Sequence, residues 1–200
     1  HIKREADGTL LGTAFSVWAP NAQAVSLVGD HNFWDRATHP MVRAGSTGIW
    51  EIFIPDVGLN TCYKFAICTI NGNWVDHADP LARATEHPPR TASVVTESTY
   101  SWSDTQWMEN RKSYQPWRSP VSVYEVHAGS WRPGLSYLQM AEELVAYVLE
   151  QGFTHVEFLP ITEHPYSPSW GYQVTSFFAP TSRFGSPDEF KYLVNALHDA

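Results

Sequence analysis

Hydrophobic and polar residues alternate in short runs through the first hundred residues, which predicts β-strands separated by turns. Phe15 and Val17 alternate with small or polar neighbours, and a similar alternation runs from Trp50 to Ile54. Asn71-Gly72 lies between two further runs and predicts a hairpin with positive φ at both residues. Strands at this spacing, with no helical period between them, predict a β-sandwich.

The pattern changes at residue 120. The β-branched run Val121–Val126 predicts a strand, and Ser136 with Gln139 has the spacing of a capping box at the start of a helix. Apolar residues then recur at helical spacing until Gly152, a residue type that commonly ends helices. The apolar run His155–Leu159 predicts a second strand.

A long loop over residues 160–185 follows this strand, and Ser186, Pro187 and Glu189 then predict the start of another helix. The order strand, helix, strand, loop, helix is typical of the beginning of a parallel α/β fold. A (β/α)8 barrel needs ~250 residues. We therefore expect a truncated TIM barrel containing only its first two βα units.

Residues between these two regions are polar, with scattered tryptophans and little periodicity, and are predicted to form a connecting segment. The fold class is therefore multidomain, β followed by α/β. The predicted parts are a sandwich at 1–100, a connecting segment at 101–119 and an incomplete barrel at 120–200.

Composition excludes several functions. Lys and Arg number 13 against 21 Asp and Glu, giving a formal charge of −8, and no basic cluster provides a footprint for nucleic acid. No apolar run approaches the ~18–20 residues of a membrane span. Aromatic residues make up 14% of the chain, which suits a ligand with flat apolar faces such as a sugar.

The two cysteines are predicted to be reduced thiols. Cys62 and Cys68 lie six residues apart in one predicted strand, about 20 Å at ~3.3 Å per residue, and a disulfide spans only ~4.4–6.8 Å between Cα atoms. Reduced thiols favour a cytoplasmic protein. Because the sequence begins with His1, we expect the natural N-terminus to lie upstream, and a signal peptide cannot be judged.

Sequence motifs for metal or cofactor chemistry are lacking, so we expect neither group. The nine histidines show no metal-ligand spacing, and phosphate-binding and dinucleotide-binding loops are absent. Carboxylates that could serve a retaining glycosidase, which needs a pair ~5–5.5 Å apart, are Glu125, Glu157 and Glu163. The first two lie in or near strands, which favours packed or ion-paired side chains, and Glu163 stands alone in the loop.

The loop over residues 160–185 is the best candidate for a binding region, because long loops at this edge of a barrel carry function. Trp170-Gly171-Tyr172 places two aromatic residues beside a flexible one, an arrangement suited to stacking on a pyranose ring. The alternative is that Trp170 and Phe177-Phe178 attach the loop to the barrel by packing. For Tyr172 both interpretations stay open.

Several motifs together resemble bacterial glycogen (1,4-alpha-glucan) branching enzymes of the alpha-amylase superfamily. In order along the chain, they are Phe15–Ala22, Val28–Asp35, Tyr63–Phe65, Tyr124–Trp131, Gly152–Pro160, Glu163–Pro165, Ser169–Thr175, Phe178–Gly185 and Asp188–Phe190. Two positions depart from the pattern: His31, where Phe is more usual, and Ala128, where Leu is more usual.

The resemblance implies an enzyme that cuts an α-1,4 glucan, holds the piece as a covalent glycosyl intermediate and transfers it to a 6-hydroxyl. It implies an immunoglobulin-like, glycogen-binding-type sandwich. It places the catalytic acids beyond Ala200, so this N-terminal segment is expected to be inactive by itself. The implied partners are α-1,4-glucan or glycogen and the remainder of the barrel, in the cytoplasm.

Site residues also follow from the resemblance. Tyr172 matches a tyrosine that stacks on the sugar beside the scissile bond, with Trp170 and Gln173 as neighbours. Trp34 and Trp74 are candidates for surface contact with glucan, although core packing is favoured for both. Alternatives that remain open are a debranching or trehalose-releasing hydrolase of the same superfamily and a non-catalytic glucan-binding module.

Overall fold

The computed structural model describes residues 1–200 and divides into two compact units. Unit 1 comprises His1–Glu97 with Thr175–Ala179, and unit 2 comprises Ser98–Val174 with Pro180–Ala200. The predicted domain boundaries near residues 100 and 119 stay a prediction.

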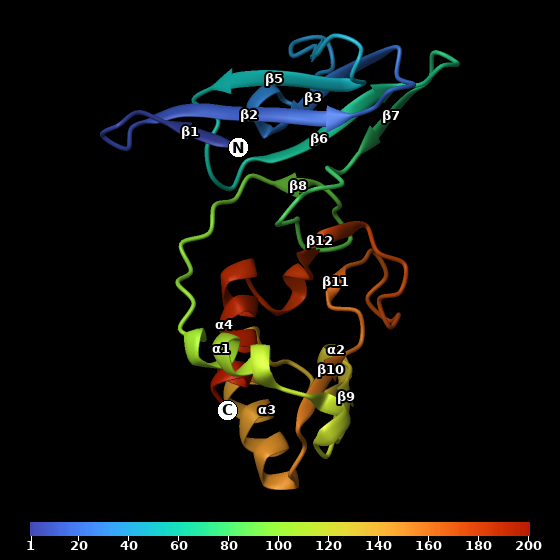
Figure 1. Ribbon diagram of the computed structural model, residues 1–200. Coiled ribbons are helices and arrows are strands. Elements are labelled where there is room, and N and C mark those ends of the chain that lie inside the picture. Colours follow the sequence, from blue (N-terminus) through green and yellow to red (C-terminus); the bar gives the residue numbers. More distant parts are fainter. The chain divides into compact units, whose positions relative to one another are not determined.

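Unit 1 is built around two antiparallel sheets, drawn as two layers in the upper part of Figure 1. One sheet has the strand order β1-β2-β5-β4 and the other β3-β6-β7, with β8 also paired to β6. The strands are β1 (Ile2–Arg4), β2 (Leu10–Trp18), β3 (Ala24–Gly29), β4 (Val42–Arg43), β5 (Ile49–Pro55), β6 (Cys62–Cys68), β7 (Trp74–His77) and β8 (Ser93–Val94).

Alternate residues of both sheets form one hydrophobic core, which confirms the predicted sandwich. Phe15 of β2 meets Tyr63 of β6 edge to face, with ring centroids 4.8 Å apart. Other members are the buried side chains of Val17, Val25, Leu27, Trp50, Ile54 and Phe65. The sequence alternation therefore identified the inward faces of these strands correctly.

The Asn71-Gly72 hairpin is confirmed, but its turn differs from the predicted one. The N–H of Gly72 donates to the carbonyl of Thr69 at 2.9 Å, and the N–H of Thr69 donates to the carbonyl of Asn73 at 2.8 Å. Gly72 has a φ of 79°, whereas Asn71 does not have a positive φ. A three-residue loop needs only its last residue in the left-handed region, so the expectation for Asn71 was wrong.

Unit 2 contains the predicted strand–helix–strand sequence. Strand β9 (Val123–Val126) pairs in parallel with β10 (His155–Phe158), and α3 (Tyr137–Gln151) connects them through the chain. Ser136 and Gln139 form the expected capping box, and Gly152 ends the helix with a φ of 75°. The buried side of α3, including Leu144 and Val148, packs with Val126 of β9.

The second predicted helix is also present as α4 (Pro187–Asp199), which begins with a capping box between Ser186 and Glu189. A short helix α2 (Ala128–Trp131) follows β9. The loop after β10 is more regular than predicted, since it contains β11 (Thr162–Glu163), β12 (Ser176–Pro180) and a 3-10 turn at Ser182–Phe184.

The predicted connecting segment contains a helix that the sequence pattern did not indicate, α1 (Thr105–Ser113). None of its residues is buried, so its sequence carries no hydrophobic period by which it could be recognised.

Residues 98–107, here called the strap, follow one side of α4. The Ser98 hydroxyl and the Thr99 N–H donate to Asp188, the Ser103 N–H donates to Asn195 at 2.9 Å, and Asp104 contacts His198 at 2.8 Å. Trp107 stacks on the His198 ring at 3.6 Å. The polar segment is therefore attached along the whole of α4.

Two of the composition-based expectations can be compared with the structure. Both Cys62 and Cys68 are free, as predicted. No helix in the chain is long and apolar enough to pass through a bilayer.

Candidate functional site

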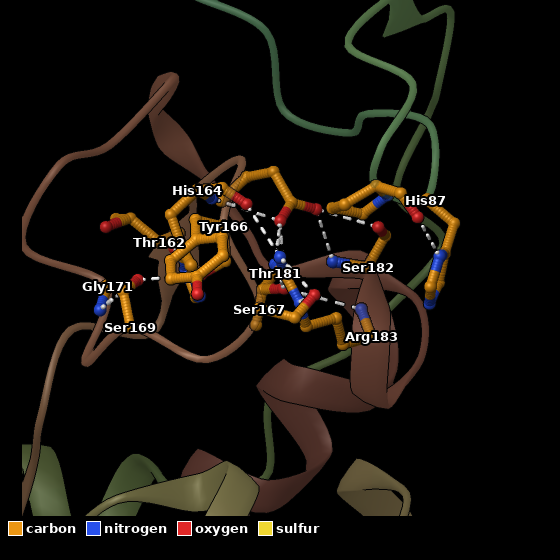
Figure 2. A network of polar contacts seen from close by, with 12 residues as sticks. His87, Thr162, His164, Tyr166, Ser167, Ser169, Gly171, Thr181, Ser182 and Arg183 are labelled. Carbon is orange, nitrogen blue, oxygen red and sulfur yellow. Dashed lines mark hydrogen bonds and ion pairs between the residues drawn. The ribbon is translucent and has the colours of Figure 1, made fainter.

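Glu163 bonds to Thr181, Ser182 and Arg183, three members of the polar network shown in Figure 2, and this network holds the loop that carries Trp170 and Tyr172. Its side chain is 3% exposed. Oε1 accepts hydrogen bonds from the His164 N–H at 3.1 Å and the Thr181 hydroxyl at 3.0 Å. Oε2 accepts from the N–H and hydroxyl of Ser182 at 2.8 and 2.7 Å. A carboxylate with this many donors is a structural anchor rather than a free nucleophile.

Arg183 completes the network as the charged partner of Glu163. Nη1 lies 2.6 Å from Oε1, and the arginine side chain is only 10% exposed. Nη2 donates to the carbonyl of His164 at 2.8 Å and to the Ser167 hydroxyl at 3.0 Å. The guanidinium thereby joins residues 163–167 to the 3-10 turn about twenty positions later.

Tyr137 of α3 adds a buried contact to the same end of the loop. Its hydroxyl donates to the carbonyl of Thr181 at 2.8 Å. Burial, and next the negative charge of Glu163, raise the pKa of Tyr137 above its ordinary value. The tyrosine therefore stays a neutral donor, and the loop is fixed to the helix that connects β9 and β10.

A tight turn over residues 166–171 contains Trp170 and directly precedes Tyr172. The Ser169 hydroxyl donates to the carbonyl of Tyr166 at 2.7 Å and accepts from the Gly171 N–H at 3.2 Å. Gly171 has a φ of 87°, and a Cβ there would lie 2.9 Å from the Pro160 carbonyl oxygen and 3.1 Å from the His164 ring. Only glycine fits this conformation and this close approach.

Trp170 and Tyr172 extend from either side of Gly171 into solvent. Their side chains are 68% and 69% exposed, and Gln173 is exposed as well. Phe177 and Phe178 are also exposed, so within this chain neither they nor Trp170 attach the loop by packing. The loop is held by polar groups instead, which leaves these rings free for a ligand.

Glu125 and Glu157 are directly opposite each other in the β9–β10 register, and both are exposed. This chain therefore leaves both side chains unpacked, although packing or ion pairing was favoured from the sequence. Their neighbours Val126 and Val156 face the other side of the sheet, toward α3. One face of this small parallel sheet is thus covered and the other is open.

A second aromatic region lies on the sandwich. Trp34 is 41% exposed and Trp74 38%, so core packing, favoured from the sequence, is wrong for both. Arg36 lies over the Trp74 ring at 5.9 Å and forms an ion pair with Asp76 at 3.1 Å. These contacts connect the segment that carries Trp34 to β7. No group of three or more His, Cys, Asp or Glu side chains is placed to hold a metal ion.

The Glu163–Arg183 pair and the contact of Arg36 with Trp74 were not predicted from the sequence. One signal was present: Arg183 is the only Lys or Arg between Arg132 and Lys191, a stretch that contains several carboxylates. An isolated cation in a long loop is a candidate for a buried pair. For Arg36 the sequence contains no comparable signal.

Comparison with known proteins identifies the relatives of this chain. Residues 2–82 match the family described as carbohydrate-binding module 48 (isoamylase N-terminal domain). The 1,4-alpha-glucan branching enzyme GlgB of Nocardia farcinica is 59% identical over 194 residues. The chain resembles 1,4-alpha-glucan branching enzymes along 97% of its length. The resemblance predicted from the motifs is therefore confirmed.

Other relatives give the same result. The GlgB protein of Rhodococcus jostii is 55% identical over 194 residues, and in both comparisons the alignment covers 97% of this chain and 26% of the relative. The chain thus spans about a quarter of the length of these curated relatives. A solved structure of a putative alpha amylase from Salmonella typhimurium matches 93% of this chain and 29% of its own, with a TM-score of 0.73 and 28% identity.

Proposed function

We propose that this chain is the N-terminal part of a cytoplasmic 1,4-alpha-glucan branching enzyme, which cleaves an α-1,4 glucan and transfers the piece to a 6-hydroxyl. The observation that carries the proposal is 59% identity over nearly the whole chain to a branching enzyme, including the loop that carries Trp170 and Tyr172. The sandwich provides glucan binding, supported by the match of residues 2–82 and by the exposed Trp34 and Trp74.

Residues 120–200 would be the first two βα units of a TIM barrel. The parallel pairing of β9 and β10 supports this assignment, as does the open face that bears Glu125 and Glu157. Parallel sheets are normally covered on both faces, and the remaining barrel strands would close over this one. The catalytic carboxylates then lie in that remaining part, and none is assigned within residues 1–200.

Tyr172 is the residue proposed to stack on the sugar beside the bond that is cleaved, with Trp170 and Gln173 as further contacts. The polar anchor of Glu163 and Arg183 holds the loop without occupying these rings. Because the loop backbone is already held, binding of a pyranose face to this ring costs less ordering entropy than it would on a loop without the anchor.

The proposal predicts the effect of Tyr172 substitutions in the full-length protein. Tyr172→Ala should lower kcat/KM on amylose at least about 10-fold, because it removes an aromatic contact from the binding site, whereas Tyr172→Phe should retain most activity. The measurement is the fall in iodine absorbance together with the number of new 1,6 branches. Tyr192→Ala, which alters an exposed tyrosine on α4, is the control.

Residues 1–200 alone should leave amylose unchanged in the same assay, and new branches formed by this piece would contradict the proposal. The match to a family named after an isoamylase domain keeps a hydrolase as the second candidate. Shortened chains without new 1,6 linkages from the full-length protein would favour that hydrolase.

A further inference from the structure

The turn at Phe33 and Trp34 has an unusual backbone. Both residues lie in the left-handed region, with φ values of 52° and 64°. Bulky L-residues rarely adopt this conformation, because Cβ approaches the neighbouring carbonyl oxygen. Two successive aromatic residues in this region are a clear departure from ordinary turn chemistry, which would place Gly or Asn there.

Buried Asn32 imposes this conformation. Its Oδ1 accepts from the Gly29 N–H at 3.0 Å, and its Nδ2 donates to the carbonyls of Leu27 and Asp35, each at 3.0 Å. The Trp34 N–H also donates to the Gly29 carbonyl at 3.0 Å. The surrounding hydrogen bonds therefore hold the turn although its own residues disfavour it.

The result of this geometry is that Phe33 is displayed to solvent. Its residue is 94% exposed, whereas Phe15 and Phe65 of the same unit are 5% and 1% exposed. An apolar ring in water contributes nothing to folding through burial. The Asn32 hydrogen bonds account for how the Phe33 backbone is held, but burial does not account for its exposed ring, and a backbone outlier held in this way points to function.

The surroundings indicate what the ring would bind. Trp34 is the next residue, and Arg36 of the same segment contacts both the Trp74 ring and Asp76. Exposed rings beside a guanidinium and a carboxylate match a glucan chain, whose pyranose units have apolar faces and a rim of hydroxyls. We propose that Phe33 is a glucan-binding residue, which extends the surface of Trp34 and Trp74 by a third ring. This inference rests on the proposed glucan binding by the sandwich.

The test measures binding of maltoheptaose by calorimetry, and of glycogen by retardation in native gels, using the whole chain of residues 1–200. Phe33→Ala should weaken binding about 5- to 30-fold, the range expected for loss of an aromatic anchor, while Phe33→Tyr should bind like the unaltered chain. Leu59→Ala, at another exposed apolar residue of unit 1, should change nothing.

Phe33→Gly separates a binding role from a structural one. Glycine accepts the positive φ without strain, so this variant should melt at the same temperature as the unaltered chain or higher, and still bind as weakly as Phe33→Ala. A lowered Tm for Phe33→Gly would overturn the inference in favour of a structural role.

Trp34→Ala distinguishes the role of Phe33 from the proposed glucan binding by the sandwich as a whole. If Trp34→Ala weakens binding and Phe33→Ala does not, the role of Phe33 is overturned and the sandwich remains a glucan-binding unit. If the unaltered chain binds neither maltoheptaose nor glycogen, both are overturned. The branching activity proposed for the full-length protein is measured independently of either result.

Discussion

His31 is one of two positions where this sequence departs from the branching-enzyme pattern, and its environment is unusual for a histidine. Both ring nitrogens are buried without a hydrogen-bond partner. The ring lies 5.1 Å from that of His39, between centroids. Burial lowers the pKa of His31, the nearby His39 lowers it further, and Asp30 acts in the opposite direction. The folded state therefore favours the neutral ring.

This shift predicts that acid destabilises unit 1 through His31. Because the folded pKa lies below the ordinary value of 6.5, the unfolded chain binds the proton first, so the stabilisation is complete above about pH 6.5 and declines as the pH falls toward the folded pKa. His31→Phe should show a smaller loss of unfolding free energy between pH 7.5 and 5.5, measured by urea denaturation. His77→Gln, at an exposed histidine, is the control. Equal losses in His31→Phe and the unaltered chain would contradict this expectation.

At the scale of elements, the pair of Glu163 and Arg183 joins β11 to the 3-10 turn that precedes α4. Both side chains are buried, and each also bonds to backbone groups of the other segment or of its own. Removing one member of such a pair leaves a buried charge without compensation. The pair is therefore expected to stabilise the loop between these two segments strongly, although its members are about twenty residues apart in the sequence.

Glu163→Gln is accordingly expected to lower the unfolding free energy by about 3–5 kcal/mol and to increase proteolysis within residues 164–182. The matched control is Glu143→Gln, because the Arg132–Glu143 pair of the same unit is exposed (46% and 39%). Glu143→Gln should lower the unfolding free energy by less than about 1 kcal/mol. Denaturant unfolding followed by tryptophan fluorescence measures both, and similar losses for the two variants would refute the distinction.

Elements were predictable from the sequence where local chemistry determines them. The capping boxes at Ser136 and Ser186 and the end of α3 at Gly152 were predicted correctly, because each depends on residues within one turn. Helix α1 was missed because it buries no residue. The type of turn at Gly72 also could not be read from Asn-Gly, since loop length depends on how the two strands pair.

The candidate sites, like the helices and turns, could be predicted only where a local motif carries them. Trp170 and Tyr172 could be selected because a motif carries them, but their exposure depends on an anchor formed by residues about twenty positions apart. For Trp34 and Trp74 the sequence favoured the core, since a large aromatic residue in a β-rich region is usually buried. The turn held by Asn32 displays Trp34, and Arg36 contacts Trp74 and Asp76 about forty positions later, so no local pattern shows where both rings lie.

At the scale of the molecule, unit 2 is held together by segments distant in sequence. Hydrogen bonds to Ser98 and Lys191 and to the Thr99 N–H lower the pKa of Asp188 to about 2, although burial alone would raise it. Lys191 also contacts the Ser98 hydroxyl. The strap is therefore part of the packing of α4 rather than a passive linker.

A piece limited to residues 120–200 should consequently behave as an aggregating or molten species. It lacks the strap, and the open face of β9 and β10 stays uncovered. A piece that begins at Ser98 is the control and should melt at a higher temperature with more near-UV signal. A sharp cooperative melt of residues 120–200, monitored by circular dichroism, would contradict the prediction.

The strap also has a consequence for biosynthesis. Its contacts to α4 join residues 89 to 94 positions apart, so the ribosome makes the strap long before the helix that receives it. At roughly 5–20 residues per second, Trp102 and Trp107 emerge about 5–20 seconds ahead of His198. During that interval the two indole rings of the nascent chain lack the histidine ring on which they stack in the folded protein, so they stay exposed to water.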